Sequence, residues 1–367
     1  MAEIEKLKRP TINRIQPYSP GKSSAEVMRE LGIEKVTKLA SNENPLGPSP
    51  LAIEAMREAA AGVFVYPDPE CIELTSALAR MLEVDDDCLV IGRGSDEVLH
   101  MLGLAFVCPG DRLIFSLPPF AIYPMTARLM DAEEVGVPHR DYRHDLPAMA
   151  EAIDERTKLI FISNPYNPTG TIVTADEVEE FMARVPDDVI IAWDEAYSEY
   201  AADAPDYPDT LRYVREGRNC IVLRTFSKVY ALAGLRVGYG IARPEIIAAL
   251  KQVREPFNVG LTAQVAAVAS LRDPDQVRRS VRNNDEGKRY LYGRFEEMGL
   301  AYVRTFSNFI FVDVGMDSQK CFDQLMRRGV TVRTGDIFGF PTWIRVTIGL
   351  PKENQTFADA LADVLGG

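Results

Sequence analysis

From about residue 71 to residue 254, the chain alternates short apolar segments with segments of helical periodicity. Segments 159–163 (LIFIS) and 189–193 (VIIAW) are apolar almost throughout, as strands buried on both faces of a sheet are. This alternation predicts a mostly parallel, mixed sheet covered by helices on both faces. We therefore expect an α/β fold whose large domain has three layers: helices, sheet and helices. Strands are predicted at 88–92, 111–117, 133–137, 158–163, 188–193, 220–225 and 237–242, and helices at 71–83, 95–107, 121–131, 146–154, 174–185 and 244–254.

The pattern changes after Pro256. An apolar helix and a long charged helix at about 274–298 precede strand-like and helical segments, which predicts a smaller α+β domain. Residues 1–50 are rich in proline, asparagine and serine, which excludes long regular elements there. This N-terminal segment is either a flexible arm or an arm that lies across a pocket mouth or a partner. The predicted division is an arm that contributes to the small domain (1–45), a large cofactor-binding domain (46–258) and a small C-terminal domain (259–367).

Charge and cysteine usage limit the classes of partner. The formal net charge of −13 argues against nucleic acid or an anionic membrane surface as the main partner. No apolar run approaches the ~20 residues of a membrane helix, and the charged start MAEIEKLKRP does not resemble a secretion signal. The five cysteines are scattered and never in CxxC spacing, so we expect no metal site and no disulfide framework. Their pattern favours the cytoplasm.

Polar side chains follow the predicted strand at 220–225. Thr225 and Ser227 supply hydroxyls, Lys228 supplies an amine and Arg236 supplies a guanidinium. Ligands of open α/β sheets bind at the carboxyl ends of the strands. These groups suit a phosphorylated cofactor with a carbonyl, because the hydroxyls and guanidinium bind a phosphate and the amine forms an imine. The alternative is a surface lysine and a structural arginine.

A second strand is followed by Gly94, Ser95 and Asp96 in the sequence GRGSDE. The N-terminus of the helix that begins here offers backbone N–H groups to a phosphate. The segment resembles the start of a dinucleotide fingerprint, but Glu97 occupies the position of its last glycine. Ser95 could instead act only as a helix cap.

Three further strand ends carry ligand-binding candidates. Phe120 follows a strand and either stacks on a planar ring or belongs to the core. Asn167 lies in the rigid turn NPYNPTG, which aims a side chain at a ligand or is only a turn. Asp194 ends a buried strand, where a carboxylate needs a partner such as a protonated pyridine nitrogen, and Tyr197 follows three residues later. An ordinary capping aspartate is the alternative.

Arg333 and Arg345 lie in predicted strands of the small domain. A buried guanidinium keeps its charge and needs an anionic partner. That partner is either the carboxylate or phosphate of a substrate or an acid in a structural salt bridge.

Taken together, these motifs resemble a known enzyme family. GRGSDE, PPF, NPYNPTG, WDEAY, TFSK, LAGLRVGYG and IRVTIG are similar in order to the motifs of fold type I pyridoxal-phosphate aminotransferases. KLASNENPLGPSP, YPDPE and REPFNVG narrow the resemblance to the histidinol-phosphate aminotransferase branch. The resemblance extends from about Pro17 to Leu350 and implies the two-domain fold of that enzyme type.

The resemblance also implies roles for individual residues. Lys228 would carry the aldimine of pyridoxal 5′-phosphate, with Asp194 and Tyr197 as its catalytic partners. The cofactor would be bound by Gly94, Ser95, Asp96, Phe120, Asn167, Asp194, Tyr197, Thr225, Ser227, Lys228 and Arg236, and by Tyr66 from the second subunit of a homodimer. The substrate pocket would contain Tyr18, Asn44, Arg333 and Arg345.

The reaction implied is ping-pong transamination between histidinol phosphate and 2-oxoglutarate, in histidine biosynthesis. An aromatic amino acid aminotransferase and a phosphoamino-acid decarboxylase on the same scaffold are alternatives. A cofactor-binding regulatory module is disfavoured because the acidic chain has no segment for a DNA-binding domain. A dinucleotide oxidoreductase is disfavoured by the broken glycine pattern. Two positions depart from the family pattern: Ala231 stands where glycine is common and Tyr166 where asparagine is frequent.

Overall fold

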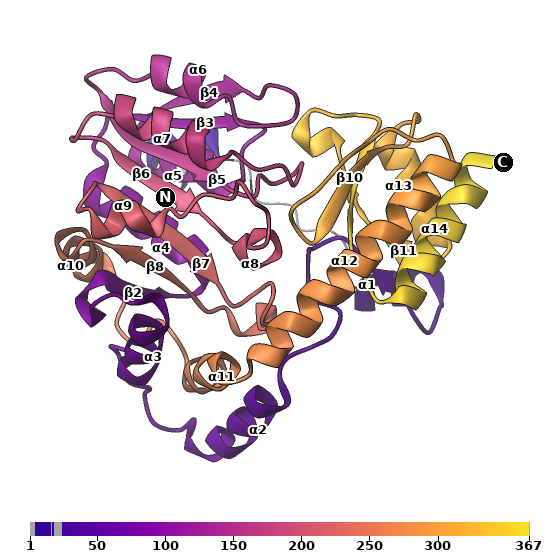
Figure 1. Cartoon of the computed structure of the whole chain (residues 1–367), viewed down its shortest axis with the longest axis horizontal. Coiled ribbons are helices and arrows are strands. Elements are labelled where there is room, and N and C mark those ends of the chain that lie inside the picture. The colour runs from indigo at the N-terminus through magenta and orange to yellow at the C-terminus, as the bar shows by residue number, and fades with distance from the viewer. Residues whose placement is uncertain (1–3, 16, 18–23, 367) are drawn as a thin grey trace.

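A computed structural model describes residues 4–15, 17 and 24–366 of the chain. Figure 1 shows a large domain on the left and a smaller one on the right, with the long helix α12 (Pro274–Glu297) running between them. The N-terminal segment begins beside the large domain and later contributes a strand to the small domain, β1 (Thr37–Lys38). The predicted combination of a large α/β domain and a smaller α+β domain is confirmed.

The large domain is built on a seven-stranded mixed sheet. Its strand order is β2-β8-β7-β6-β5-β3-β4, and β8 runs antiparallel to both neighbours while the pairs from β7 to β4 are parallel. The prediction of a mostly parallel, mixed sheet is therefore confirmed. The strands are β2 (Leu89–Gly92), β3 (Arg112–Leu117), β4 (Glu133–Pro138), β5 (Thr157–Ser163), β6 (Ile190–Asp194), β7 (Cys220–Thr225) and β8 (Gly238–Ala242).

Both faces of this sheet are buried, which explains why its central strands read as continuous apolar runs. Successive side chains of a strand point to opposite faces, so Cys220 and Val222 join one core cluster while Ile221 and Leu223 join the other. Residues of α4 (Gly94–Phe106), α5 (Ile122–Met130) and α10 (Pro244–Val253) pack on one face. Residues of α3 (Ile72–Leu82), α6 (Leu146–Glu151), α7 (Ala175–Arg184) and α9 (Leu211–Arg215) pack on the other.

The small domain has its own sheet and core. An antiparallel sheet of order β12-β13-β10-β9 packs with α12, α13 (Ser318–Arg327) and α14 (Pro351–Gly366). β1 pairs in parallel with β11, so the N-terminal segment is tied to this domain. The segments 301–314 and 330–335, each of which the sequence pattern suggests as one strand, are each divided into two strands in the structure. The strands are β9 (Tyr302–Val303), β10 (Phe309–Asp313), β11 (Val330–Thr331), β12 (Arg333–Thr334) and β13 (Trp343–Thr347).

Helix α11 (Leu261–Leu271) bears on the division between the domains. It packs against α2 (Pro50–Ala59) and α3, and its buried alanines join the core of the large domain. We propose that the large domain extends through α11 and that the small C-terminal domain begins with α12. The remaining α-helices of the described residues are α1 (Ser24–Leu31) and α8 (Ser198–Ala201).

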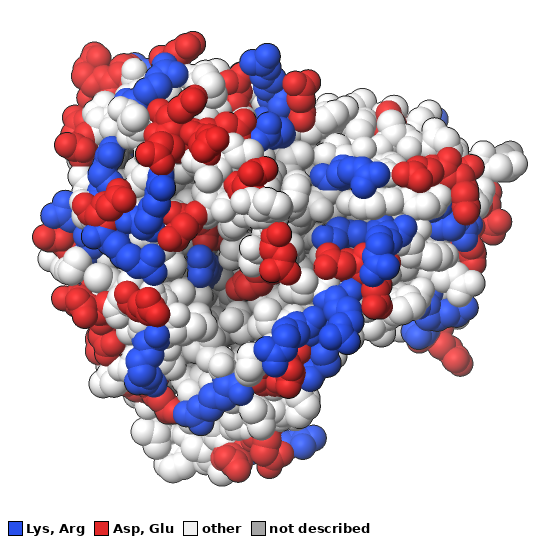
Figure 2. Space-filling model, viewed as in Figure 1, with Lys and Arg blue, Asp and Glu red and all other residues white. Residues whose placement is uncertain are grey.

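The surface carries both signs of charge. Figure 2 shows acidic and basic side chains interspersed over the large domain, and Lys and Arg gathered along α12. Among the described residues, no helix combines the length and apolarity that crossing a membrane requires.

Candidate active site

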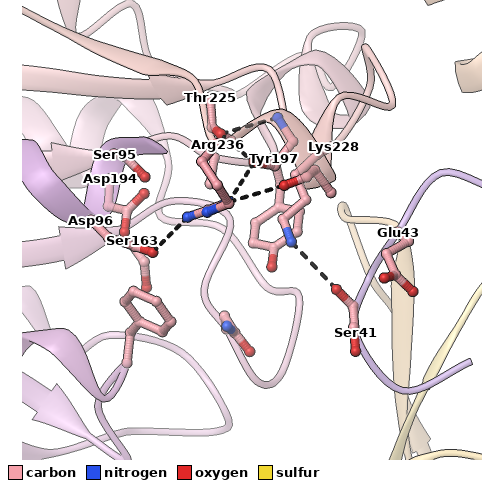
Figure 3. Close-up of a pocket in the computed structure, with 15 residues that line it drawn as sticks. Ser41, Glu43, Ser95, Asp96, Ser163, Asp194, Tyr197, Thr225, Lys228 and Arg236 are labelled. Atoms are coloured by element: carbon pink, nitrogen blue, oxygen red, sulfur yellow. Dashed lines mark hydrogen bonds and ion pairs between the residues drawn. The ribbon is translucent and has the colours of Figure 1, made fainter. Parts of the chain in front are cut away.

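A cavity of about 230 Å³ lies at the carboxyl ends of β5, β6 and β7, where the segment after β1 crosses the large domain (Figure 3). Because these strands are neighbours and parallel, their terminal residues are brought to one edge of the sheet. The predicted site residues that line the cavity are Ser95, Asp96, Phe120, Asn167, Asp194, Tyr197, Thr225, Ser227, Lys228 and Arg236. The same cavity is lined by five residues that were not predicted from the sequence: Ser41, Glu43, Ser163, Ala196 and Ala233.

Lys228 points into this cavity from the loop that follows β7. Its amine Nζ lies 3.5 Å from the carbonyl oxygen of Ser41 and 5.4 Å from the ring centroid of Tyr197. Figure 3 shows the lysine side chain between these two residues. The amine therefore faces the ligand space from a fixed loop at the end of a core strand.

At one end of the cavity, groups that can bind an anion lie close together. Arg236 donates from Nη1 to Ser227 Oγ (3.3 Å) and from Nη2 to Asp96 Oδ2 (3.0 Å). The Thr225 hydroxyl donates to Ser227 Oγ at 2.9 Å, so both hydroxyls and the guanidinium converge. The N-terminus of α4 faces the same place and adds backbone N–H groups and its positive dipole end.

Gly94 allows that close approach. Its φ is +73°, and a Cβ at this position would lie 2.7 Å from Nη2 of Arg236. Any other residue would both strain the backbone and displace the guanidinium. This is the reason for a glycine at the first position of α4.

Asp194 presents a carboxylate with one oxygen in use and one without a partner. Its side chain is buried, and Oδ2 accepts a hydrogen bond of 2.7 Å from the hydroxyl of Tyr123. Oδ1 is buried and makes no hydrogen bond with any described residue. Burial raises the pKa of this carboxyl to about 6. An unpaired buried acceptor at the cavity wall fits a ligand with a protonated ring nitrogen, which is what the expected cofactor offers.

Arg345, on β13 of the small domain, is not among the residues that line the cavity but contacts Asn167, which is. It donates from Nη1 to Asn167 Oδ1 at 2.6 Å and from Nη2 to the carbonyl oxygen of Ala40 at 3.1 Å. The rings of Phe309 and Phe338 lie 5.2 and 5.6 Å from its guanidinium carbon. Because the Asn167 oxygen accepts from Arg345, the amide nitrogen of Asn167 is the atom left for the cavity.

Phe120 packs on the core and also faces the cavity. It is half-buried, packs on the core cluster beneath α4 and α5, and lines the cavity. Its ring meets that of Tyr123 edge to face, with centroids 5.6 Å apart. The core therefore fixes a ring whose remaining surface is available to a planar ligand.

Several predicted residues do not line the cavity of one chain. Asn44 is buried and donates to the carbonyl oxygen of Val229 and to Ser280 Oγ, both at 2.8 Å. Tyr66 is 78% exposed and stacks on Phe257. Tyr18 lies outside the described residues. Arg333 pairs with Arg345 across β12 and β13, so it is near the site without lining the cavity.

The structure explains one of the two departures from the family pattern, Tyr166, and not the other, Ala231. Tyr166 is buried and its hydroxyl donates to the carbonyl oxygen of Pro118 at 2.7 Å, so it braces the loops beside the cavity. Ala231 has a φ of +58°, a conformation that favours glycine. Neither residue is among those that line the cavity.

Two supporting residues were missed. Tyr123 lies on α5, where no motif marks it, yet it donates to Asp194. Asn42 donates to the hydroxyl of Tyr197 at 2.9 Å. Asn42 lies in the SNENP sequence, part of a motif that supports the family resemblance, but no role was assigned to Asn42 itself.

Comparisons with known proteins identify the family. The family model described as aminotransferase class I and II matches residues 34–361. The chain is 54% identical to the histidinol-phosphate aminotransferase of Moorella thermoacetica over 358 residues, which cover 97% of this chain and 92% of that protein. It is 45% identical to the histidinol-phosphate aminotransferase of Caldicellulosiruptor saccharolyticus, with 97% and 99% covered.

Solved structures show the same fold. The histidinol-phosphate aminotransferase of Sinorhizobium meliloti in complex with pyridoxal-5′-phosphate has a TM-score of 0.89 at 29% identity, with 97% of each chain covered. An aspartate aminotransferase of Thermus thermophilus with maleate has a TM-score of 0.84 at 21% identity, with 98% and 99% covered.

Proposed function

Because the chain belongs to the class I and II aminotransferases, we propose that it is a pyridoxal-phosphate-dependent transaminase that exchanges the amino group of histidinol phosphate with 2-oxoglutarate. The observation that carries this proposal is a single cavity with three matched features. Its walls carry a lysine amine, an unpaired buried carboxylate oxygen and a group of anion-binding residues. This group, here called the anion cradle, consists of Arg236, Thr225, Ser227 and the N-terminus of α4. The relative that is 54% identical, a histidinol-phosphate aminotransferase, supports the choice of substrate.

When bound, pyridoxal phosphate supplies an aldehyde that links to an amine and a protonated ring that withdraws electrons from the bonds at the reacting carbon. Asp194 Oδ1 would accept from the ring N–H and keep that nitrogen protonated. Arg236, Thr225, Ser227 and the N-terminus of α4 would bind the phosphate. Phe120 would cover one face of the ring.

Lys228 has two tasks in this arrangement. Its Nζ would hold the cofactor through the amine and, when free, would carry a proton to and from the substrate's α-carbon. The closeness of Lys228 to the Tyr197 ring and the Ser41 carbonyl fixes where that amine can move.

Arg345 would bind the acidic end of either substrate. A phosphate and a carboxylate are both anions that a guanidinium binds through paired hydrogen bonds. The contact with Asn167 and the two flanking aromatic rings hold the guanidinium in one orientation. One pocket can therefore serve both halves of a ping-pong reaction.

The test is a donor panel. The purified holoenzyme is assayed with histidinol phosphate, phenylalanine, tyrosine and phosphothreonine against 2-oxoglutarate, and kcat/KM is compared. We expect histidinol phosphate to exceed the others by at least about tenfold, or about 1.4 kcal/mol. A preference for phenylalanine or tyrosine would instead establish an aromatic aminotransferase. Release of CO2 without a 2-oxo acid acceptor would establish a decarboxylase.

Lys228→Ala is the control for the panel. It should still bind pyridoxal phosphate through the anion cradle but lose transamination with every donor. Borohydride should fix the cofactor to the native protein and leave the variant unlabelled. A native protein that stays colourless and unlabelled would overturn the pyridoxal-phosphate assignment.

We also propose that the enzyme acts as a homodimer in the cytoplasm. The four consecutive large side chains from Val63 to Tyr66 are 58–86% exposed. Exposed apolar patches of this kind mark surfaces that bind another protein. Tyr66 would reach the phosphate of the second subunit, as the resemblance implies. The five cysteines are all free thiols, which supports a reducing compartment.

A further inference from the structure

The segment Ala40–Asn44, here called the strap, connects the two domains at the cavity. The carbonyl oxygen of Ala40 accepts from Arg345 on β13 of the small domain at 3.1 Å. The carbonyl oxygen of Ser41 faces Lys228 of the large domain at 3.5 Å. The strap therefore touches both the proposed substrate arginine and the proposed cofactor lysine.

The side-chain amide of Asn42 at the centre of the strap has one orientation. The Thr347 hydroxyl accepts from the backbone N–H of Asn42 at 2.9 Å and donates its single proton to Asn42 Oδ1 at 3.2 Å. Oδ1 is thereby fixed as the acceptor, and Nδ2 is the atom that faces the hydroxyl of Tyr197 at 2.9 Å. Asn42 is only 2% exposed, so water does not compete for these contacts.

This contact determines what the Tyr197 hydroxyl can do. Its oxygen accepts from Asn42, so its own proton is left to be donated elsewhere. Within the described part of the chain, Asn42 is the hydrogen-bond partner identified for this hydroxyl. The ring of Tyr197 lines the cavity and packs edge to face on Phe309, which prevents it from turning away. Tyr197 therefore presents a hydrogen-bond donor to the ligand.

We propose that Asn42 is a positioning residue that holds Tyr197 as the donor to the phenolic oxygen of the cofactor ring, and so favours the unprotonated form of the C=N link at Lys228. This proposal rests on the proposed function, since it requires pyridoxal phosphate in the cavity. The physical reason is charge. Loss of the proton from the link leaves the phenolate without a neighbouring positive charge, and a donated hydrogen bond then stabilises it most.

The test is a pH titration of the link's visible absorbance in the native holoenzyme and in Asn42→Asp. An aspartate has nearly the same shape, but its carboxylate accepts a hydrogen bond where the amide nitrogen donated one. The hydroxyl of Tyr197 would then donate to this carboxylate and no longer to the cofactor ring. We expect the pKa of the link to rise by about one unit, a tenfold change in its proton affinity. Asn42→Ala should raise this pKa less, because the hydroxyl could still rotate towards the ring.

A new carboxylate also raises the pKa of the link through its charge alone, so the control is the same substitution in a Tyr197→Phe background. The other titratable groups around the cavity are unchanged in all four proteins: Asp194, Asp96, Arg236, Glu43 and Tyr123. If Asn42 acts through Tyr197, Asn42→Asp adds much less to the pKa in the Tyr197→Phe protein than in the native one. An equal rise in both backgrounds would show a simple field effect and overturn the proposal.

Thr347→Val is a second variant in case Asn42→Asp does not fold. It removes the hydroxyl that fixes the amide, so it should raise the pKa of the link in the native background and not in the Tyr197→Phe background. Equal pKa values for Thr347→Val and the native protein would count against the proposal. A native protein without the visible band would instead refute the proposed function, so the two failures are distinguishable.

Discussion

Asp194 combines two opposing requirements in one side chain. Burial disfavours its charged form and raises its pKa to about 6 from an ordinary value of 3.8. The unpaired oxygen is nonetheless the feature that suits a ring N–H. The chain thus bears a cost in stability at this residue that binding of the cofactor would offset.

This cost predicts a pH dependence of the cofactor-free protein. Because the folded pKa lies above the unfolded one, the folded state holds the extra proton, and stability falls as pH rises from about 4 to about 6. Asp194→Asn should remove this fall and make the cofactor-free protein more stable at pH 7 by about 3 kcal/mol. Urea unfolding at pH 4 and pH 7 measures the difference.

Glu199 contributes equally to the pH dependence of the native protein and of Asp194→Asn, so its contribution cancels in that comparison. Burial raises its pKa to about 7, so it adds its own loss of stability with rising pH to both proteins. Only the difference between native protein and variant reports on Asp194. Identical pH profiles for the two would contradict the prediction.

At the scale of an element, the loop after β7 has a strained backbone at a position where the sequence departs from the family pattern. Ala231 holds a left-handed conformation, φ +58°, within the loop that carries Lys228. For a residue with a Cβ this conformation costs about 1–2 kcal/mol, whereas glycine adopts it freely at a smaller entropic cost. The glycine that is common at this position would relieve that strain.

Ala231→Gly should therefore stabilise the protein by about 0.5–1 kcal/mol. The matched control is Ala233→Gly in the same loop, where φ is not positive and the substitution should destabilise by a similar amount. Thermal or urea unfolding of the two variants checks the signs. A loss of stability in Ala231→Gly would show that the alanine methyl contributes contacts larger than the strain.

The elements themselves were largely predictable, and the reason is physical. Strands buried on both faces must be apolar, so the runs at 189–193 and 220–223 are recognisable in the sequence and place Asp194, Thr225 and Lys228 at one sheet edge. Tyr123 could not be predicted as a partner of Asp194, because their contact depends on how α5 packs on the sheet and not on any local pattern. The placement of α11 against α2 likewise follows from long-range packing.

At the scale of the whole molecule, the exposed run Val63–Tyr66 is the strongest sign of a second subunit. Phe64 is 86% exposed, and burying it in a symmetric interface would contribute roughly 2 kcal/mol per chain. Phe64→Asp should therefore weaken dimerisation by roughly a thousandfold, since both copies change. Sedimentation velocity over a range of concentrations measures this.

Leu104→Asp provides the comparison for that experiment. Leu104 is 55% exposed but stands singly on α4, so its replacement should leave the association unchanged. If Phe64→Asp sediments as the native protein does, the apolar run is not part of the interface. The phosphate contact proposed for Tyr66 would then have no support.

The strap also has a consequence for the order in which the protein matures. Asn42 and its partner Thr347 are 305 positions apart in sequence, and Asn308, which donates to the Asn42 carbonyl, is 266 positions away. During synthesis the strap leaves the ribosome long before β13 does. The large sheet can assemble earlier, but the wall that orients Tyr197 can form only after β13 has emerged. Chains truncated before β13 should therefore hold pyridoxal phosphate poorly.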